Sequence, residues 1–191
     1  METNTLFHEN LSKRFQKHHI NNISEDCIRY DYFNAITSFI DTSDVVLEYS
    51  HPNNAKQKID CVIKHPDSVI EAIEFKFYRP IPSKRNTPQT QLLGQLFKDF
   101  YKLKDFQESS VKTMVIVAYK NMEKYINNKF QLFSGINNNG NEVFIAKELL
   151  ESQEKTFQVN IEPYSNVDLN IARTFCERLH DEYIVSILNI K

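Results

Sequence analysis

Two acidic residues and a lysine lie in short apolar stretches, where charged side chains are costly to bury. Asp60 lies in the stretch 58–64, and Glu74 and Lys76 lie in the stretch 70–78. A residue such as Val or Thr would avoid the cost of placing a charge on a half-buried surface. Carboxylate oxygens are ligands that Mg²⁺ prefers, and an ammonium group can stabilise a negatively charged phosphate. The three residues therefore indicate a site for a divalent cation and a phosphate.

The two stretches have the residue types and the period of β-strands. Apolar side chains alternate along both: Ile59, Cys61 and Ile63 in the first, Ile73, Phe75 and Phe77 in the second. Residues 65–68 predict a turn between them, so an antiparallel hairpin is expected. If Lys64 pairs with Ile70, then Asp60 pairs with Glu74, and their Cβ atoms lie about 5 Å apart. The lysine two residues later then shares the same face of the sheet.

Asp60, followed after thirteen residues by Glu74-Phe75-Lys76, resembles the motif of the PD-(D/E)xK phosphodiesterase superfamily. This superfamily includes many restriction endonucleases, resolvases and repair nucleases. The resemblance covers the hairpin and extends more weakly to helices expected at 24–30 and 91–103. Ile59 stands where the motif can have proline. The resemblance implies an α/β fold with a restriction-endonuclease-like core, in which helices flank a mixed central β-sheet.

The resemblance also implies the roles of the site residues. Asp60, Glu74 and Lys76 are the expected catalytic residues of a Mg²⁺-dependent deoxyribonuclease, and Mn²⁺ is expected to substitute for Mg²⁺. Asp60 and Glu74 are the expected metal ligands. An acidic residue of the first helix often reaches the metal site in this superfamily, and Glu25 is the candidate here. The simpler alternative for Glu25 is a favourable interaction with the helix dipole.

Four residues are weaker candidates for contact with nucleic acid: Arg29, Lys84, Arg85 and Gln95. Arg29 is placed to hold a carboxylate or a phosphate from the first helix. Lys84 and Arg85 follow two prolines after the second strand, where a loop could contact a nucleic-acid backbone or simply be solvated. Gln95 belongs to the polar stripe of the helix at 91–103, and exposure to solvent alone also accounts for it.

Composition and length restrict the class of protein. The chain has 191 residues with 41% hydrophobic and 12% aromatic residues, which is typical of a globular protein. We expect one domain, 1–191, with an N-terminal helical arm at 1–22 and a C-terminal α/β extension at 140–191. The net charge of −2 neither indicates nor excludes nucleic-acid binding. No signal peptide, membrane span or zinc-type cysteine spacing is recognisable, so we expect a cytoplasmic protein without a membrane partner.

The remaining pattern predicts alternating strands and helices. Ser24 is a predicted helix N-cap for a helix that runs to about Ile40. Strands are expected at 45–49, 113–119, 143–145, 157–161 and 183–190, and helices at 121–133 and 167–180. The run 113–119 is so apolar that it predicts an interior strand, parallel to a neighbour. This order favours an α/β domain with a mixed sheet.

Three functions are compatible with these patterns. The first is a metal-dependent DNA endonuclease, of restriction or phage-defence type, with RNA as an alternative substrate. The second is a catalytically silent protein of the same fold that binds nucleic acid or a partner protein. The third is an unrelated fold in which the motif is accidental, for example a hairpin with a surface salt bridge between Glu74 and Lys76. The complete set of Asp60, Glu74 and Lys76 favours the first, and cutting both strands with one site per chain would favour a homodimer.

Overall fold

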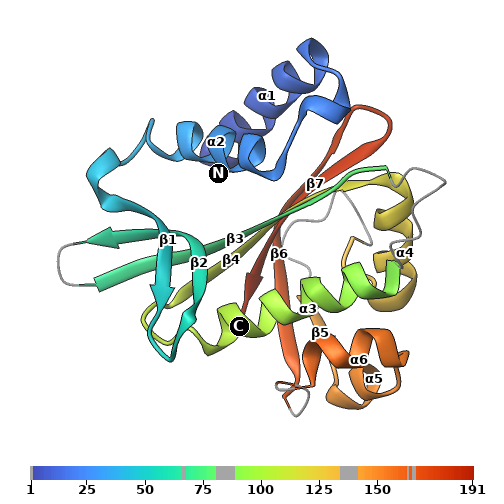
Figure 1. Cartoon of the computed structure of the whole chain (residues 1–191). Helices are drawn as coiled ribbons and strands as arrows, with labels where there is room; N and C mark the ends of the chain where they lie inside the picture. Colours follow the sequence, from blue (N-terminus) through green and yellow to red (C-terminus); the bar gives the residue numbers. More distant parts are fainter. Residues whose placement is uncertain (1, 66–67, 81–88, 134–141, 163, 165–166) are drawn as a thin grey trace.

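The computed structural model describes residues 2–65, 68–80, 89–133, 142–162, 164 and 167–191 (Figure 1). The strands are β1 (Val45–His51), β2 (Asn54–His65), β3 (Ser68–Tyr78), β4 (Val111–Tyr119), β5 (Glu142–Ile145), β6 (Leu169–Leu179) and β7 (Tyr183–Ile190). The helices are α1 (Glu2–Lys17), α2 (Glu25–Ile36), α3 (Gln89–Asp105), α4 (Lys120–Phe130), α5 (Lys147–Glu151) and α6 (Lys155–Ile161). Short 3-10 turns lie at Ile20–Asn22 and Thr42–Asp44.

The strands form one seven-stranded mixed sheet in the order β1-β2-β3-β4-β7-β6-β5. The β3–β4 pair is parallel, and the other strand pairs in the described part of the chain are antiparallel. A parallel connection needs a crossover, and α3 supplies it between β3 and β4. The predicted α/β class with a mixed central sheet is therefore confirmed, and so is the parallel pairing of β4.

Helices cover both faces of the sheet and create two apolar cores. Phe7 and Leu11 of α1 and Ile28 of α2 pack with one face of the sheet. Phe97 of α3, together with apolar residues of α4 and α6, packs with the opposite face. Figure 1 shows α3 lying across the sheet, with its C-terminal end close to the turn between β1 and β2. Because α2 and α3 lie on opposite faces, each can present polar side chains to the strands from its own side.

A partly buried ion pair joins α1 to α2. Arg14 Nε lies 2.6 Å from Asp31 Oδ2, and Arg14 Nη2 donates to Asp31 Oδ1 at 2.7 Å. This two-pronged geometry satisfies both carboxylate oxygens with one guanidinium. Arg14 lies in the N-terminal arm expected at 1–22, and through this pair it holds the two helices together.

The β2–β3 hairpin confirms the predicted register near the site but not near its turn. Cys61 pairs with Ile73, the register that places Asp60 opposite Glu74. Lys64 pairs with Val69 instead of Ile70, because the ladder is irregular between Ile63 and Lys64. A local irregularity of this kind leaves no clear trace in the period-two pattern.

Two predictions for the C-terminal third were wrong. The segment 157–161 was expected as a strand but is α6, in which Phe157 and Ile161 are buried while Val159 is 64% exposed. The spacing of four residues between Phe157 and Ile161 fits one face of a helix, and Val159, two residues from each, lies on the opposite, exposed face. The segment 167–180 was expected as a helix but forms β6, where it pairs with β5 and β7.

Other boundaries differ by a few residues. The helix expected to reach Ile40 ends at Ile36, while the predicted strand 183–190 is confirmed as β7. Residues 140–191, which we expected as an extension, supply β5, β6 and β7 to the sheet. Lys84 and Arg85 lie outside the described residues. None of the described helices is sufficiently long and apolar to traverse a membrane.

Candidate active site

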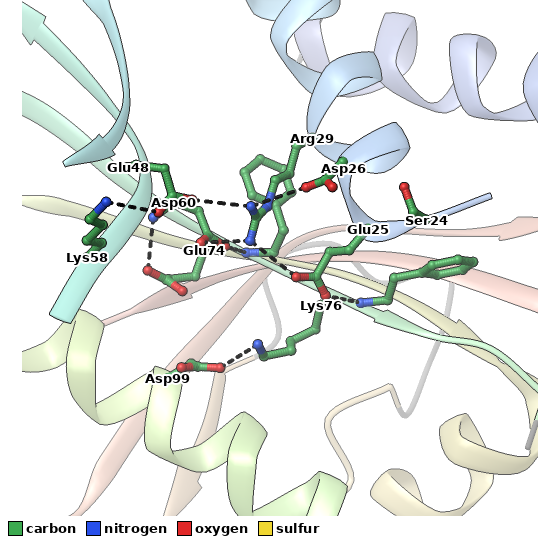
Figure 2. A network of polar contacts seen from close by, with 12 residues as sticks. Ser24, Glu25, Asp26, Arg29, Glu48, Lys58, Asp60, Glu74, Lys76 and Asp99 are labelled. Carbon is green, nitrogen blue, oxygen red and sulfur yellow. Dashed lines mark hydrogen bonds and ion pairs between the residues drawn. The ribbon is translucent and has the colours of Figure 1, made fainter. Parts of the chain in front are cut away.

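The carboxylates of Asp60 and Glu74 lie between β2 and β3, where hydrogen bonds link the side chain of each to the main chain of the other strand. The Asp60 amide donates to Glu74 Oε1 at 3.1 Å. The Phe75 amide donates to Asp60 Oδ2 at 3.0 Å. Each acidic side chain therefore accepts a backbone amide from the opposite strand. The structure brings the two predicted acids together, side by side in Figure 2.

Glu74 is an unusually buried carboxylate, with 1% of the residue exposed. Its Oε2 lies 2.7 Å from Lys102 Nζ. Burial, and next the negative charge of Asp60, raise the pKa of Glu74 to about 8, although Lys102 opposes the change. A carboxylate that is both desolvated and close to another carboxylate favours any ligand that brings positive charge.

Asp60 is held from the opposite side by α2. Arg29 Nη2 donates to Asp60 Oδ1 at 2.9 Å. The same guanidinium lies 3.3 Å from Glu25 Oε1 and 3.3 Å from Glu48 Oε1. Arg29, a candidate for holding either a carboxylate or a phosphate, thus holds carboxylates in this structure.

Glu25 reaches the edge of the site from the first turn of α2. Ser24 caps the helix, because its hydroxyl accepts the Cys27 amide at 3.4 Å. Glu25 Oε2 accepts the Phe77 amide of β3 at 3.0 Å. Burial raises the pKa of Glu25, while Lys76 is the strongest of the groups that oppose the change. Glu25 therefore lies both at the helix N-terminus and against the strand that carries the expected catalytic residues.

Lys76 points toward α3 and forms its ion pair there. Its Nζ lies 2.7 Å from Asp99 Oδ2, the contact drawn in Figure 2. Burial alone would lower the pKa of Lys76, but Asp99, then Glu25 and Glu74, raise it. The ammonium therefore stays charged. A surface salt bridge between Glu74 and Lys76 is not what the structure contains, since each has a different partner on α3.

Asp99 and Lys102 are the residues of the site that sequence reasoning missed. Lys102 Nζ contacts Glu74, lies 3.7 Å from Asp99 Oδ1, and donates to the Lys58 carbonyl at 2.9 Å. The spacing of three residues puts both side chains on one face of α3. Gln95, one turn before Asp99, is exposed. The sequence placed Lys102 in the polar stripe of this helix, but the stripe alone does not show which of its residues face β3.

A divalent cation is compatible with this donor set. Across residues 2–65, 68–80, 89–133, 142–162, 164 and 167–191, no group of three or more His, Cys, Asp or Glu residues is arranged to hold a metal ion. Mg²⁺, however, commonly uses only one or two carboxylates together with water and substrate phosphates. Asp60 and Glu74 provide those two carboxylates. Binding would require Arg29 and Lys102 to release carboxylate oxygens that they contact here.

Comparisons of this chain with protein-family models, with curated proteins and with solved structures find no match. The resemblance to the PD-(D/E)xK superfamily therefore stays a prediction. The chemistry open to the site follows from its own groups: two adjacent carboxylates, a third carboxylate at the edge, and a charged lysine held by an aspartate.

Proposed function

We propose that this chain is a metal-dependent nuclease that hydrolyses phosphodiester bonds, with DNA as its substrate and Mg²⁺ as its cofactor. The observation that carries the proposal is the reciprocal bonding of Asp60 and Glu74 across β2 and β3. It holds two carboxylates together at a place where a sheet built only for stability would have apolar or neutral residues. Lys76, two residues after Glu74, adds a positive charge from the same strand.

Each residue has a role in this proposal. Asp60 and Glu74 would hold Mg²⁺, which supplies polarisation of the phosphate and a more acidic bound water. Lys76 would stabilise the negative charge that grows on the phosphate oxygens as the bond breaks. Asp99 fixes the Lys76 ammonium, and Arg29 fixes the Asp60 carboxylate. These two contacts hold the groups in place in the metal-free protein, and Arg29 would release the Asp60 oxygen when the metal binds.

One observation favours a second candidate, a catalytically silent protein that binds nucleic acid. Arg29 and Lys102 each contact a carboxylate oxygen of the pair. If these two cations remain in place when the protein binds DNA, they would neutralise the site without a metal. Direct metal binding by Asp60 and Glu74 distinguishes the two candidates.

The test combines metal titration with cleavage. Plasmid DNA, single-stranded DNA and RNA are incubated with Mg²⁺ or Mn²⁺, and Mn²⁺ binding is measured by calorimetry. The wild-type chain should bind Mn²⁺ and cut DNA, while Glu74→Gln should do neither. Glu182→Gln, which removes an exposed carboxylate far along the sequence, is the control and should behave like the wild type. Cleavage that persists in Glu74→Gln would refute the site, and metal-independent DNA binding without cleavage would favour the silent protein.

Location and assembly belong to the same proposal. We propose that the protein acts in the cytoplasm. A double-strand cut would need two copies of a chain that carries one site, so a homodimer is the expected form on duplex DNA. Sedimentation of the chain with and without DNA tests this expectation.

A further inference from the structure

A pocket of about 430 Å³ opens beside the candidate active site. Its lining includes Asp26, Arg29 and Tyr30 of α2, Leu47 and Glu48 of β1, and Asp60 of β2. Asp60 therefore belongs both to this pocket and to the pair of carboxylates. A ligand that fills the pocket would continue directly into the site.

The walls of the pocket carry apolar surface that the protein itself leaves uncovered. Tyr30 is 57% exposed and Leu47 is 55% exposed. The guanidinium of Arg14 lies 5.9 Å from the centroid of the Tyr30 ring. Because Asp31 holds Arg14 with two hydrogen bonds, this contact helps to fix the ring. A fixed, exposed aromatic ring next to an aliphatic side chain is a good platform for a flat apolar ligand.

The edge of the pocket carries a backbone conformation that is unfavourable for its residue. Glu48 lies within β1 but has φ 54°, in the left-handed region that favours glycine. The neighbouring pairs Leu47–Cys61 and Tyr49–Ile59 keep the regular register. Strain of this kind persists where the surroundings hold it, and it is frequent at binding sites. Here Arg29 and Lys58 hold the Glu48 carboxylate.

Charge decides what kind of group the pocket would accept. Among the described lining residues, Asp26, Glu48 and Asp60 supply three carboxylates and Arg29 supplies one guanidinium, while Lys58 approaches Glu48 from outside the lining. A phosphate would be repelled by this balance. A nucleobase with an exocyclic amino group has a flat apolar face for Tyr30 and Leu47, and hydrogen-bond donors for the carboxylates.

We propose that this pocket binds an unpaired nucleobase that carries an amino group, so that the preferred substrate is single-stranded nucleic acid containing cytosine, adenine or guanine. The inference rests on the proposed function, because the phosphate next to the bound base would lie at Asp60 and Glu74. Bases in a duplex are stacked and paired, and they cannot enter such a pocket unless they are extruded.

The test measures binding in Ca²⁺, a cation that takes the same kind of oxygen ligands as Mg²⁺, and gel electrophoresis verifies that the oligonucleotides stay uncut. Fluorescein-labelled oligo-dC, oligo-dT and a duplex of the same length are titrated with the protein and followed by anisotropy. Oligo-dC should bind about tenfold more tightly than the duplex, since stacking of one base contributes about 1–3 kcal/mol. Oligo-dC should also bind more tightly than oligo-dT, which has no exocyclic amino group.

Substitutions locate the binding surface. Tyr30→Ala and Leu47→Ala should each weaken oligo-dC binding several-fold. Phe144→Ala and Leu149→Ala remove exposed side chains of matching kinds on β5 and α5, outside this pocket, and should leave binding unchanged. Circular dichroism verifies that all four variants fold.

The outcomes separate this inference from the proposed function. Equal or tighter binding of the duplex, or binding that Tyr30→Ala and Leu47→Ala leave intact, would overturn the base pocket even if the chain cuts DNA. Absence of binding to every oligonucleotide would overturn it too. If the wild-type chain shows no metal-dependent cleavage, the nuclease proposal is refuted. Single-strand binding that depends on Tyr30 would still support the pocket.

Discussion

Asp31 and Glu74 are both buried carboxylates, 4% and 1% exposed, but their surroundings differ. In the described part of the chain, Asp31 is paired with Arg14, which donates to both of its oxygens. Glu74 receives an amide and a lysine but also has Asp60 beside it. The first arrangement balances one charge with one charge and joins two helices. The second brings two like charges together and draws on β2, β3, α2 and α3 to hold them.

The difference separates a carboxylate that stabilises the fold from one that awaits a ligand. A balanced buried pair contributes to stability mainly because breaking it leaves a charge without a partner. A crowded pair of acids is unfavourable until a cation joins it. Substitutions at the two places should therefore have opposite consequences for stability and for function.

The largest effect is expected at the crowded pair. Asp60→Asn or Glu74→Gln should reduce metal-dependent cleavage by at least about 100-fold, because each removes a charge that acts at the reacting phosphate. Stability should change little, because the lost contact with Arg29 or Lys102 offsets the relief of crowding between the acids. Cleavage rates measured under single-turnover conditions test the first expectation, and urea unfolding curves test the second. A variant that keeps the wild-type rate would show that the acids have no role in the chemistry.

A substitution in the balanced pair of Arg14 and Asp31 should lower stability and leave cleavage almost unchanged. Asp31→Asn should lower the free energy of unfolding by up to about 3 kcal/mol, because the partly exposed Arg14 guanidinium loses its buried partner. The rate of cleavage at a temperature where the variant is folded should stay near that of the wild type. Urea unfolding followed by circular dichroism gives the stability. If Asp31→Asn were as stable as the wild type, the pair would not be what joins α1 to α2.

The pH dependence of stability should carry the signature of Glu74. The pKa of Glu74 is about 8 in the folded protein against an ordinary value of 4.5. Between these pH values the folded state keeps a proton that the unfolded chain has released. The metal-free protein should therefore lose stability as the pH rises through this window, by up to about 1.4 kcal/mol per pH unit.

The comparison with Glu74→Gln isolates that contribution. The variant should show a shallower dependence, because glutamine does not titrate. Glu25 and Glu71, whose pKa values are also raised mainly by burial, contribute to the slope of both proteins and cancel in the difference. Unfolding curves in EDTA at about pH 5, 6, 7 and 8 provide the slopes. Identical slopes would mean that Glu74 is not protonated in the folded protein.

The smallest effect is expected at Asp99. Asp99→Asn should slow cleavage by less than about tenfold, because Lys76 stays present but loses the carboxylate that fixes it. The alkaline limb of the pH–rate profile should also move to lower pH, since Asp99 is the strongest of the groups that raise the pKa of Lys76. A rate that falls without any movement of the profile would mean that Asp99 acts only on the fold.

Period-two patterning was sufficient to predict the hairpin, because apolar residues recur at positions 59, 61 and 63 of the first strand and at 73, 75 and 77 of the second. The same rule failed at 157–161 and 167–180. In the first segment, Phe157 and Ile161 are four residues apart and satisfy one face of a helix equally well. In the second, Leu169 and Ile171 alternate toward the core, but the alternation is lost after residue 174, where two buried residues are followed by two exposed ones. Pairing with β5 and β7 is what makes it a strand.

The partners of the site show a similar limit. Asp60 and Glu74 could be placed together because strand register converts sequence separation into distance. Asp99 and Lys102 come from a helix whose rotation over the sheet is set by packing of Phe97 and Phe100. Local sequence gives the polar face of that helix but not the strand beneath it.

By itself, the sequence determined the α/β class, the hairpin and the pairing of two acids on adjacent strands, because alternation along a strand is a local property of the backbone. Only the tertiary structure decided that Arg29 and Lys102 hold those acids, that Lys76 turns to Asp99, and that a pocket opens beside Asp60. These contacts join residues far apart in the chain. Their geometry depends on how whole helices pack against the sheet, which no local pattern encodes.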